Sequence, residues 1–524
     1  MMTSTPDDLD QLDAHQLREL ARQLMLANAR KDQDITFKAA RITALTHEIA
    51  LLRRHKFGQK SEQLGGEQAL LFDEAVGEDL EAIERELNKL KNQSAPSEPR
   101  DKPRRAALPP ELPRTTIHHE PASTTCDCGC QLKRIREDVS EKLDYTPGTF
   151  SVERHVRGVW ACTHCQSMTQ ASMPAYIIDK GIAAVGLLAQ VLIAKYADHL
   201  PLYRQEAIFK RDGMHIPRSS MAQWVGQCGH ELQPLVDALR RCILQHRIIH
   251  ADETPVRMLK PGSGKTHKAY LWTYAPGKFE SLKAVIYDFN EGRAGLYARE
   301  FLGDWQGQLV VDDYSGYNAL FRQGVTELGC MAHARRKFFD LHKNNQSPVG
   351  QQALELIGEL YAIEREAVTL SPTRRLALRQ EKARPLADAL HAWMLAQRQR
   401  VLNGTGTAKA LDYSLKRWVA LTRYLDDPFI PIDNNHIEQQ IRPVAIGRNN
   451  WLFAGSLRAG KRAAAIMSLI QSAKLNGVNP HAYLKDVLTR LPTHPNSRID
   501  ELLPHNWVAP QADGVDAVSE KICA

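Results

Sequence analysis

The chain contains 524 residues, more than a single hydrophobic core usually organises, so we expect about three or four folded units. Apolar residues make up 43% of the sequence and charged residues 25%, which is ordinary for a soluble protein. The formal net charge is +7 and the isoelectric point lies near 8.8, which is compatible with a nucleic-acid partner without establishing one. Length and composition thus exclude a small single-domain fold. Whether the protein binds nucleic acid depends on where the basic residues are placed.

The sequence shows no sign of export or of a membrane span. Residues 1–12 are polar and acidic and lack the apolar core of a signal peptide. The most hydrophobic window, residues 181–194, is too short to cross a bilayer and contains Gln190, so we interpret it as a buried helix. The nine cysteines are then expected to be reduced, and the crowding of five of them between Cys126 and Cys165 indicates metal rather than disulfides.

Residues 17–52 carry apolar side chains at heptad spacing and predict an N-terminal helix. Polar residues such as Asn28 and Lys31 interrupt the seam, so a coiled coil here is marginal and needs a partner chain or DNA to settle it. An amphipathic helix packed on its own protein is the alternative. One register contains Leu17, Leu24, Leu45 and Leu52, and the other contains Ile35, Ile42 and Ile49.

A basic cluster follows directly at the end of this seam. Its Arg53, Arg54 and Lys56 are predicted to lie along the phosphates of DNA, although a solvated helix end has the same composition. Residues 73–91 then predict an acidic helix. The next stretch, residues 92–115, is rich in Pro, Ser and Arg and predicts a linker, because it buries too little apolar surface to offset the entropy of ordering.

Cysteines at both ends of a strand-like stretch predict a structural zinc module. Two knuckles of two cysteines each present four thiolates tetrahedrally to Zn²⁺. The first knuckle offers three thiols for two places, so its binding pair is open, and buried thiols without metal are the alternative. The cysteines are Cys126, Cys128, Cys130, Cys162 and Cys165, and the substitute ligands are His118, His119 and His164.

Residues 183–244 show helical periodicity throughout. Within them, residues 202–225 predict a helix, a turn at Gly213 and a second helix opened by Pro217 and Ser219, which is helix-turn-helix spacing. Many all-α segments share this spacing, so a DNA-reading element and a plain helical pair are both open.

From Arg247 onward the apolar residues alternate with period two. Three short β-runs are followed by a helix-like stretch, residues 292–302, and then by a fourth run, a helix and a fifth run. Three meandering strands, a helix, a strand, a helix and a strand is the element order of the ribonuclease-H-like fold. This order predicts that the first and fourth strands lie side by side.

Acidic residues stand at the ends of the first and fourth runs. Asp252 and Asp312 would become neighbours, and two such carboxylates repel each other unless a cation lies between them; oxygen ligands favour Mg²⁺ or Mn²⁺. A third carboxylate from a covering helix would complete a two-metal site with ions about 4 Å apart, and Glu438 is placed to supply it. Ordinary strand-end acids are the alternative.

Glu438 itself stands among basic residues in the stretch 433–476, whose second half predicts a helix. A carboxylate on a basic surface suggests a metal ion that works on a phosphodiester, whereas a Glu–Arg pair on a helix surface is the alternative. Of these basic residues, Arg442, Arg448, Lys461 and Arg462 are predicted to hold phosphates. The basic residues are Arg442, Arg448, Arg458, Lys461 and Arg462.

Two further segments complete the pattern. Cys330 and His333 follow the fifth β-run and are predicted to orient the active-site edge or to pack against it. Residues 345–423 are mostly helical, rich in Arg and Leu, and separate Asp312 from Glu438 more widely than a compact nuclease core requires. They predict an inserted helical domain that grips DNA.

Several stretches of the chain resemble the transposase of the insertion sequence 66 family, the large TnpC-type protein of bacterial mobile elements. Agreement in so many parts is highly specific and covers nearly the whole chain, from the N-terminal coil to Trp507. The stretches around the acids and His333 are HADETPV, VVDDYSGYNAL, GCMAHARRKF and DNNHIEQQIRPVAIGRNNWLFAGS, and the upstream ones are LLRRHKFGQKSE, EKLDYTPGTF and AKYADHLPLYRQE.

The resemblance implies a DDE recombinase with Asp252, Asp312 and Glu438 as the triad that binds two Mg²⁺ (or Mn²⁺) ions. It implies hydrolysis at the ends of the element by metal-activated water, then attack of the freed 3′-hydroxyl on target DNA. The family usually has Gly where Asp313 stands, and the Asp313 side chain is expected to point to the other face of the strand.

The same resemblance implies the partners and the location. They are the terminal inverted repeats and the target DNA, a homo-oligomer of at least two chains in the DNA complex, and possible accessory proteins of the same element, with no membrane. A cytoplasmic, nucleoid-associated bacterial protein is expected.

The predicted architecture is multidomain α+β. Its parts are a leucine-zipper-like coil (1–60), an acidic helix and Pro-rich linker (61–115), a zinc-binding module (116–176), a helical, helix-turn-helix-like DNA-binding domain (177–245), a ribonuclease-H-like core (246–344 and 424–490), a helical insertion (345–423) and a C-terminal extension (491–524).

Other classes of function were weighed against the transposase. A DNA-binding regulator that has lost catalysis would be favoured by a missing triad member, and all three are present. A metal nuclease without strand transfer would use the same residues. The sequence GSGKT at residues 262–266 suggests a nucleotide-binding loop, but Leu259 stands where that loop needs Gly and no helix pattern follows, so we reject it.

Overall fold

The structure is a computed structural model that describes residues 14–57, 66–91, 112–121, 130–146, 148–179, 181–259 and 265–509, and the single positions 108, 110, 123 and 125. These residues form a mixed α/β protein with two mixed sheets. The chain divides into two compact units. One consists of Met1–Gln63 and Asp79–Arg105, and the other of Leu64–Glu78 and Ala106–Ala524.

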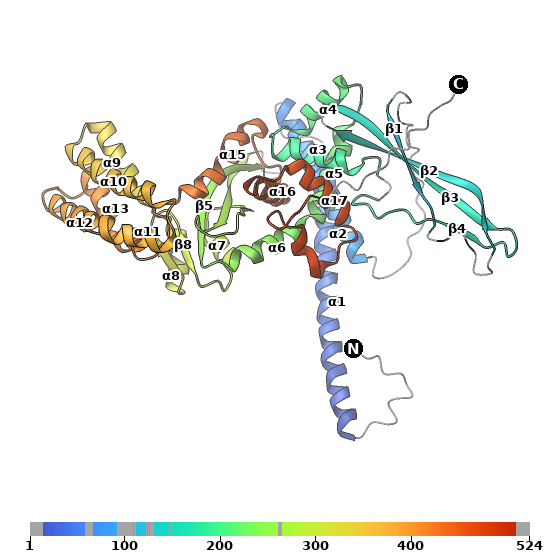
Figure 1. Ribbon diagram of the computed structural model, residues 1–524, viewed down its shortest axis with the longest axis horizontal. Helices are drawn as coiled ribbons and strands as arrows, with labels where there is room; N and C mark the ends of the chain where they lie inside the picture. Colours follow the sequence, from blue (N-terminus) through green and yellow to red (C-terminus); the bar gives the residue numbers. More distant parts are fainter. Residues whose placement is uncertain are drawn as a thin grey trace. The chain divides into compact units, whose positions relative to one another are not determined.

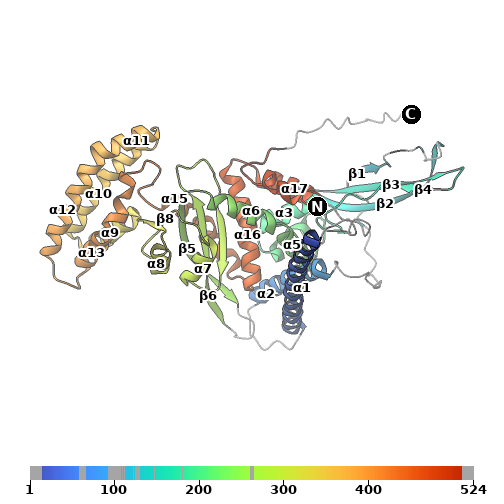
Figure 2. The same cartoon turned by 90° about the horizontal axis from the view of Figure 1, so that it is seen from below.

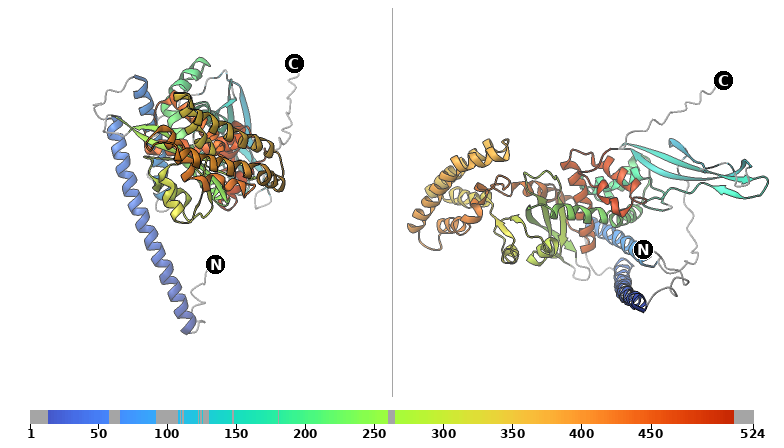
Figure 3. Two further views of the ribbon diagram at one scale, coloured as in Figure 1. Left: turned by 90° about the vertical axis from the view of Figure 1, so that its left-hand side faces the viewer. Right: turned by 60° about the horizontal axis from the view of Figure 1, so that its bottom comes forward.

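The first unit contains α1 (Ala14–Phe57) and the second half of α2 (Gly66–Lys91). Figure 3 shows α1 as one uninterrupted helix. Along the predicted seam, Leu45 and Leu52 are buried, whereas Leu24 and Ile35 are more than half exposed. Ion pairs join the two helices, Arg41 Nε to Glu86 Oε1 at 2.7 Å and Arg53 Nη2 to Glu84 Oε1 at 2.6 Å. The C-terminal half of the seam is therefore buried, and its N-terminal half presents apolar side chains to solvent.

In the second unit, a four-stranded sheet follows the first half of α2 along the chain. β2 and β3 form a long antiparallel ribbon whose register runs from Leu132 opposite Cys162 to the turn at Gly148, which has a φ of +85° (Figure 1). β1 adds in parallel to β3, and β4 pairs with the end of β3. The strands are β1 (Arg114–His119), β2 (Leu132–Thr146), β3 (Thr149–Cys162) and β4 (Met168–Gln170).

Four helices follow this sheet. The hydrophobic window predicted as a buried helix is confirmed, because α3 is buried at eight of its positions. The predicted helix, turn and helix are also present: α4 ends before Gly213, which has a φ of +87°, and Pro217 precedes the first residue of α5. The helices are α3 (Val185–Tyr196), α4 (Leu202–Arg211), α5 (Arg218–Glu231) and α6 (Gln233–Leu244).

A five-stranded sheet forms the centre of the second unit, in the order β7-β6-β5-β8-β9. β5 pairs antiparallel with β6 and parallel with β8, so the predicted contact of the first and fourth strands is confirmed, with Ile249 opposite Leu309. At the GSGKT sequence a strand rather than a helix begins, at Thr266. The strands are β5 (Ile248–Leu259), β6 (Thr266–Pro276), β7 (Ile286–Asn290), β8 (Gln308–Val310) and β9 (Thr326–Leu328).

α16 closes the open edge of this sheet. Two buried serines on the helix bond the backbone of the edge strand: Ser468 Oγ accepts the N–H of Tyr287 at 2.8 Å, and Ser472 Oγ accepts that of Val285 at 3.0 Å. A covered edge cannot pair with another chain. Gly460 permits the close approach, because a Cβ there would lie 2.2 Å from the ring of Phe289. Figure 2 shows α15 and α16 beside the strands. The connecting and covering helices are α7 (Gly295–Leu302), η2 (Ser315–Tyr317), α8 (Asn318–Arg322), α15 (Asn435–Trp451), α16 (Leu457–Leu475), α17 (Pro480–Arg490) and η5 (Asn496–Leu502).

Helices fill the stretch between the fifth strand and α15, as predicted for residues 345–423. They share a second hydrophobic cluster with Phe338 of α9, so the helical bundle begins earlier than residue 345. Arg379 is fully buried in it and forms a two-bond ion pair with Glu364, both N–O distances being 2.7 Å. The elements are α9 (Met331–Asn345), α10 (Pro348–Ala367), α11 (Pro372–Leu378), the π-turn η3 (Arg379–Ala383), α12 (Arg384–Gln399), α13 (Gly406–Lys416), α14 (Trp418–Thr422) and η4 (Arg423–Leu425).

Among the described residues, no helix combines the length and the apolar character needed to cross a bilayer.

Candidate active site

An open pocket of about 500 Å³ lies where β5, α9 and α15 meet. Asp252, Glu253 and Thr254 of β5 form one wall. The N-terminal turns of α9 and α15 form the others with His333 and Glu438. The pocket therefore gathers side chains from segments that are more than 180 residues apart in the chain.

Asp252 is the most strongly perturbed acid of this pocket. Burial raises the pKa of Asp252 to about 8, and the neighbouring carboxylates of Glu253, Asp312 and Glu438 add to the effect. Its Oδ1 accepts the backbone N–H of Glu253 at 2.8 Å. Since the other two predicted triad members act on its ionisation, the three carboxylates share one electrostatic environment.

Asp312 follows the end of β8, the parallel neighbour of β5. Its Oδ1 accepts the N–H of Tyr314 at 2.9 Å, and its Oδ2 lies 4.0 Å from Nη2 of Arg293. Asp313 does not compete for this place: its carboxylate forms an ion pair with Arg417, which also donates to the carbonyl oxygen of Asp312 at 3.1 Å.

Glu438 is positioned by Asn434, which precedes the first residue of α15 and is fully buried. The Asn434 side chain contacts β5 twice, through Oδ1 to Nδ1 of His250 at 2.6 Å and through Nδ2 to the carbonyl oxygen of Ala251 at 2.9 Å. Its backbone N–H donates to Sγ of Cys330 at 3.2 Å. One residue thus joins β5, the start of α9 and the start of α15, and Glu438 stands one helical turn further on.

Glu253 is a buried acid of the site that the sequence analysis missed. Arg293 Nη2 lies 2.6 Å from its Oε1, and the Tyr317 hydroxyl donates to its Oε2 at 2.8 Å. Burial raises the pKa of Glu253, with Asp312 as the next cause. The adjacent acids in the sequence ADET were a signal, but the sequence gives no indication that Arg293 would neutralise only the second of them.

Cys330 and His333 both lie beside Glu438. Cys330 is buried at the N-cap of α9, and burial raises the pKa of its thiol to about 12. Nδ1 of His333 lies 3.9 Å from Oε1 of Glu438. The two predicted supporting residues are therefore at the active-site edge, and their role there stays a prediction.

Two of the three triad acids have no cationic partner among the described lysines and arginines. Within the part of the chain that the structure describes, no lysine or arginine forms an ion pair with Asp252 or Glu438, and Arg293 lies at the 4.0 Å limit from Asp312. Grouped oxygen ligands with unbalanced negative charge fit a hard divalent cation such as Mg²⁺ or Mn²⁺. The donor set is thus chemically suited to the ion that the sequence predicts.

Basic residues near the pocket fall into two groups. Arg336 of α9 and Arg442 of α15 line the pocket, and Arg335 and Arg365 line an adjoining pocket of about 510 Å³ that shares Arg336. None of these four arginines forms an ion pair within the described residues. Of these four arginines, only Arg442 is predicted from the sequence as a phosphate contact. The other three lie on α9 and α10, far from Glu438 in the chain.

The remaining predicted DNA contacts have other places in the structure. Arg462 is buried and its Nη2 lies 2.6 Å from Oε2 of Glu78, so we correct its predicted role as a phosphate contact: a side chain sealed from solvent cannot reach DNA. Arg448 donates to Oγ1 of Thr254 at 3.2 Å and to the carbonyl oxygen of Pro255, so it holds α15 on β5.

Lys461 is exposed on α16, and Arg53 is paired with Glu84. The side chains of Arg54 and Lys56 lie outside the described residues.

The second knuckle of the zinc module is well formed. Cys162 Sγ accepts the N–H of Cys165 at 3.5 Å, and Gln166 takes a φ of +61° as the chain turns back. Cys130 lies two residues before Leu132, which is opposite Cys162 in the ribbon, so three thiols lie at one end of it. These three thiols could supply three of the four ligands of a tetrahedral zinc site.

The other thiols and the substitute ligands are placed differently. Cys126 and Cys128 lie outside the described residues. His119 contacts Nδ1 of His155 at 3.0 Å on the ribbon, and His118 lies next to it, opposite Val156. His164 lies in the knuckle turn between Cys162 and Cys165.

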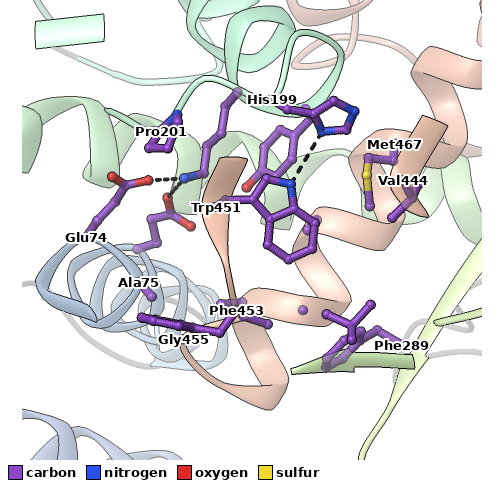
Figure 4. Close-up of a pocket in the computed structure, with 18 of the residues that line it drawn as sticks. Glu74, Ala75, His199, Pro201, Phe289, Val444, Trp451, Phe453, Gly455 and Met467 are labelled. Carbon is purple, nitrogen blue, oxygen red and sulfur yellow. Dashed lines mark hydrogen bonds and ion pairs between the residues drawn. The ribbon is translucent and has the colours of Figure 1, made fainter. Parts of the chain in front are cut away.

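A second, more enclosed cavity of about 90 Å³ lies beside α2, α3 and α16 (Figure 4). Glu74 and Glu78 of α2 line it together with Lys195, whose Nζ forms ion pairs with both carboxylates. Trp451 donates its indole N–H to Nδ1 of His199 at 3.4 Å across the same space. The walls are otherwise apolar, so the cavity is part of the core.

Acids on two parallel neighbouring strands and a covering helix that act on one another's ionisation, beside arginines without an ion pair among the described residues, are typical of metal-dependent enzymes that act on nucleic-acid phosphodiesters. Comparison with known proteins identifies the family within this class. Residues 180–462, more than half of the chain, match the family described as "Transposase IS66 family". The chain belongs to this family of transposases.

Three further matches cover other parts of the chain. Residues 468–505 match the "IS66 C-terminal element", residues 44–117 the "Transposase C of IS166 homeodomain", and residues 123–166 the "zinc-finger binding domain of transposase IS66". The family membership supports a zinc-finger domain, a leucine-zipper-like domain and DNA as the partner.

Similar proteins occur in Sinorhizobium fredii. The uncharacterized protein y4qI is 38% identical over 490 residues, which are 89% of this chain and 89% of that protein. The uncharacterized protein y4hP is 34% identical over 493 residues, with the same coverage of each chain. The uncharacterized protein y4jD is 34% identical over 508 residues, 93% of this chain and 99% of its own.

Proposed function

We propose that this protein is an active DDE transposase that cuts the ends of a mobile element and joins them to target DNA. The observation that carries the proposal is that Asp252 and Glu438 line one open pocket without a lysine or arginine partner among the described residues, while Asp312 lies near enough to raise the pKa of Asp252. Such an arrangement destabilises the metal-free site and favours a divalent ion together with the phosphate that the ion attracts.

The sheet supports a ribonuclease-H-like core. Its order is third strand, second, first, fourth and fifth, with the first and fourth side by side as the element order predicts, and the two acidic strands pair in parallel. Asp252 and Asp312 then belong to neighbouring strands, and Glu438 comes from the helix that packs on β5.

Asp252, Asp312 and Glu438 would hold the metal. When bound, the ions would lower the pKa of the attacking water or hydroxyl and neutralise charge on the leaving oxygen. Asn434 orients the helix that carries Glu438, and the Tyr314 N–H holds the Asp312 carboxylate. Arg293 neutralises Glu253, which leaves the three remaining carboxylates free to take the cation.

Two displacements at phosphorus make up the proposed reaction. In the first, a water oxygen bonds to phosphorus as the bond to the 3′ oxygen breaks, which leaves a 3′-hydroxyl on the element end. In the second, that 3′ oxygen bonds to a target phosphorus and the target's own 3′ oxygen leaves; each attacking group loses a proton and each leaving oxygen gains one. Little acid–base work is then required of side chains.

The unpaired arginines give the DNA a path away from the triad. Arg336 and Arg442 line the triad pocket, and Arg335 and Arg365 extend the same basic surface between α9 and α10. We assign these four residues to phosphate contacts, and the helical bundle α9–α14 to gripping DNA. Each such contact adds to the affinity and to its dependence on salt.

We also retain the predicted division of the chain, with the bundle beginning at α9. Cys162, Cys165 and two cysteines of the first knuckle would hold the structural zinc, and α1 would supply contacts for a homo-oligomer of at least two chains on paired ends. Accessory proteins of the same element remain part of the proposal.

The test is cleavage and joining of a labelled element end with Mg²⁺ or Mn²⁺. We expect joined products with wild type and with Asp313→Asn, because Asp313 is paired with Arg417. Asp252→Asn, Asp312→Asn and Glu438→Gln should each abolish them. If wild type binds the DNA but neither cuts nor joins it, even with the helper proteins of the element, a DNA-binding regulator replaces the transposase; if it cuts without joining, a nuclease does.

A further inference from the structure

We propose that Cys330, His333 and Glu438 form a binding site for Zn²⁺, separate from the zinc-finger cysteines. The proposal goes beyond transposition, since the ligand geometry stands whether or not the chain joins DNA. The residues come from two places, the first turn of α9 and the first turn of α15, so a bound ion would tie the two helices together at the active-site edge.

The ligand atoms already lie near one another. One nitrogen of His333, Sγ of Cys330 and one carboxylate oxygen of Glu438 lie within 4.8 Å of each other, and in the described part of the chain no other group of three His, Cys, Asp or Glu does so. Tetrahedral Zn²⁺ with ordinary bond lengths needs about 3.4 to 3.7 Å between ligand atoms. The 3.9 Å from His333 Nδ1 to Glu438 Oε1 is close to that requirement.

His333 carries an unmet demand for a partner. Its Nδ1 is buried and makes no hydrogen bond within the described residues. A buried ring nitrogen without a partner costs free energy, and a metal ion removes that cost by accepting its lone pair. The same nitrogen is the one that faces Glu438.

Cys330 is prepared to act as a thiolate once a metal displaces its proton. Its Sγ accepts the N–H of Asn434 at 3.2 Å, and it occupies the N-cap of α9, where the helix dipole favours negative charge. Cys330 and His333 are three residues apart, so the start of α9 presents both in one turn.

The chemistry of the ligands selects the ion. Thiolate and imidazole favour Zn²⁺ and disfavour Mg²⁺, whereas Asp252 and Asp312 offer only hard oxygens. Three protein ligands leave a fourth position open, and His333 and Glu438 both line the triad pocket. Glu438 would thus lie between the zinc site and the triad that offers hard oxygen ligands. Zinc bound to Glu438 would therefore change how the triad binds its own cation.

The experiment counts zinc on the purified full-length chain by native mass spectrometry, with affinity from a Zn²⁺ titration against a chelator. Wild type should carry one more zinc than Cys330→Ser or His333→Asn. Losing a direct ligand should weaken that site more than about 100-fold, because loss of an outer-shell partner alone costs 10- to 100-fold. Cys242→Ser, a half-buried thiol on α6, is the matched control and should bind as wild type does.

Cobalt absorption provides a second measurement. It changes only if Cys330 binds the metal directly, and not if Cys330 merely stabilises the fold. With the zinc finger loaded, Co²⁺ should give wild type a sulfur-to-cobalt charge-transfer absorption that Cys330→Ser lacks and excess Mg²⁺ does not remove. Equal zinc counts, affinities and spectra in wild type, Cys330→Ser and His333→Asn would overturn the proposal. No DNA enters these measurements, so a chain that binds this zinc without joining DNA contradicts the proposed function alone.

Discussion

Two groups of acids in the second unit differ in whether the chain supplies cations to balance them. At the closed cavity, Lys195 pairs with Glu74 and Glu78, and Nη2 of Arg462 lies 2.6 Å from Glu78. At the open pocket, Asp252 and Glu438 have no lysine or arginine partner among the described residues. Burial raises the pKa of an acid in both groups, Glu74 in one and Asp252 in the other.

The presence or absence of a cation from the chain distinguishes acids with a structural role from acids that can bind an external ion. Where the chain supplies its own cations, a buried acid locks α2 onto α3 and α16, and the space beside it shrinks to about 90 Å³. Where it supplies none, the acids remain at a pocket of about 500 Å³ that an external cation can enter. Acidic character alone therefore does not mark a site; the absence of an internal counter-charge does.

The strongest test of the paired group is Arg462→Ala. It leaves buried Glu78 with Lys195 as its remaining cation, shared with Glu74, so we expect a loss of about 2 to 3 kcal/mol in the free energy of unfolding, measured by urea denaturation. The double variant Glu78→Leu with Arg462→Met should recover most of this loss, since paired charges replaced by apolar groups are often neutral. Equal losses in the single and double variants would contradict the paired role.

Asn434→Ala tests how the open pocket is held together. The change leaves Nδ1 of His250 and the carbonyl oxygen of Ala251 without their partner, so we expect a loss of about 1 to 3 kcal/mol. Joining should fall further than stability, because Glu438 loses its support. A joining rate that follows the folded fraction alone would show that Asn434 does not position Glu438.

The metal-free site should make stability depend on pH. The folded pKa of Asp252 is about 8 and its ordinary value is 3.8, so the folded state holds an extra proton between these values. The free energy that this proton contributes to folding is fully present below the unfolded-state pKa of Asp252. It is lost as pH rises through the folded-state pKa. With a chelator present, we expect unfolding free energy to fall by about 1 to 2 kcal/mol from pH 6 to 8. Asp252→Asn should flatten the curve; an unchanged slope would contradict the assignment.

The smallest effect on folding is expected at the basic surface. Arg442→Ala and Arg365→Ala should change the free energy of unfolding by less than about 0.5 kcal/mol, since neither residue has an ion pair to lose within the described residues. Each should lower the slope of log affinity for DNA against log salt by about 0.9 per phosphate contact. Lys474→Ala, exposed at the end of α16 outside both pockets, is a comparison that should leave the slope nearly unchanged.

Much of the fold could be predicted from the sequence because periodicity reports it. The contact of the first and fourth strands followed from the sequence of β-runs and helices. Asp252 and Asp312 were singled out as acids at the ends of two apolar runs, but β5 continues to Leu259, so Asp252 lies within its strand. Charge partners could not be predicted in this way. Arg442 and Arg462 both lie near Glu438 in the sequence, yet one lines the pocket and the other is sealed against Glu78.

Long-range contacts explain the other residues that were missed. Arg293 neutralises Glu253 from 40 residues away, and Asn434 bonds His250 across 184 residues. Neither pairing has a local spacing that a sequence pattern could report. The role of Asn434 follows only from the way in which three segments converge.

Thermal unfolding at pH 8 with and without Mg²⁺ tests the uncompensated triad most directly. Mg²⁺ at about 100 times its dissociation constant should stabilise wild type by about 2.7 kcal/mol, and Asp252→Asn or Asp312→Asn should lose this gain while Asp313→Asn keeps it. If Mg²⁺ raises the melting temperature of wild type, Asp252→Asn and Asp312→Asn equally, the open pocket is not the cation site and the contrast between the two acid groups fails.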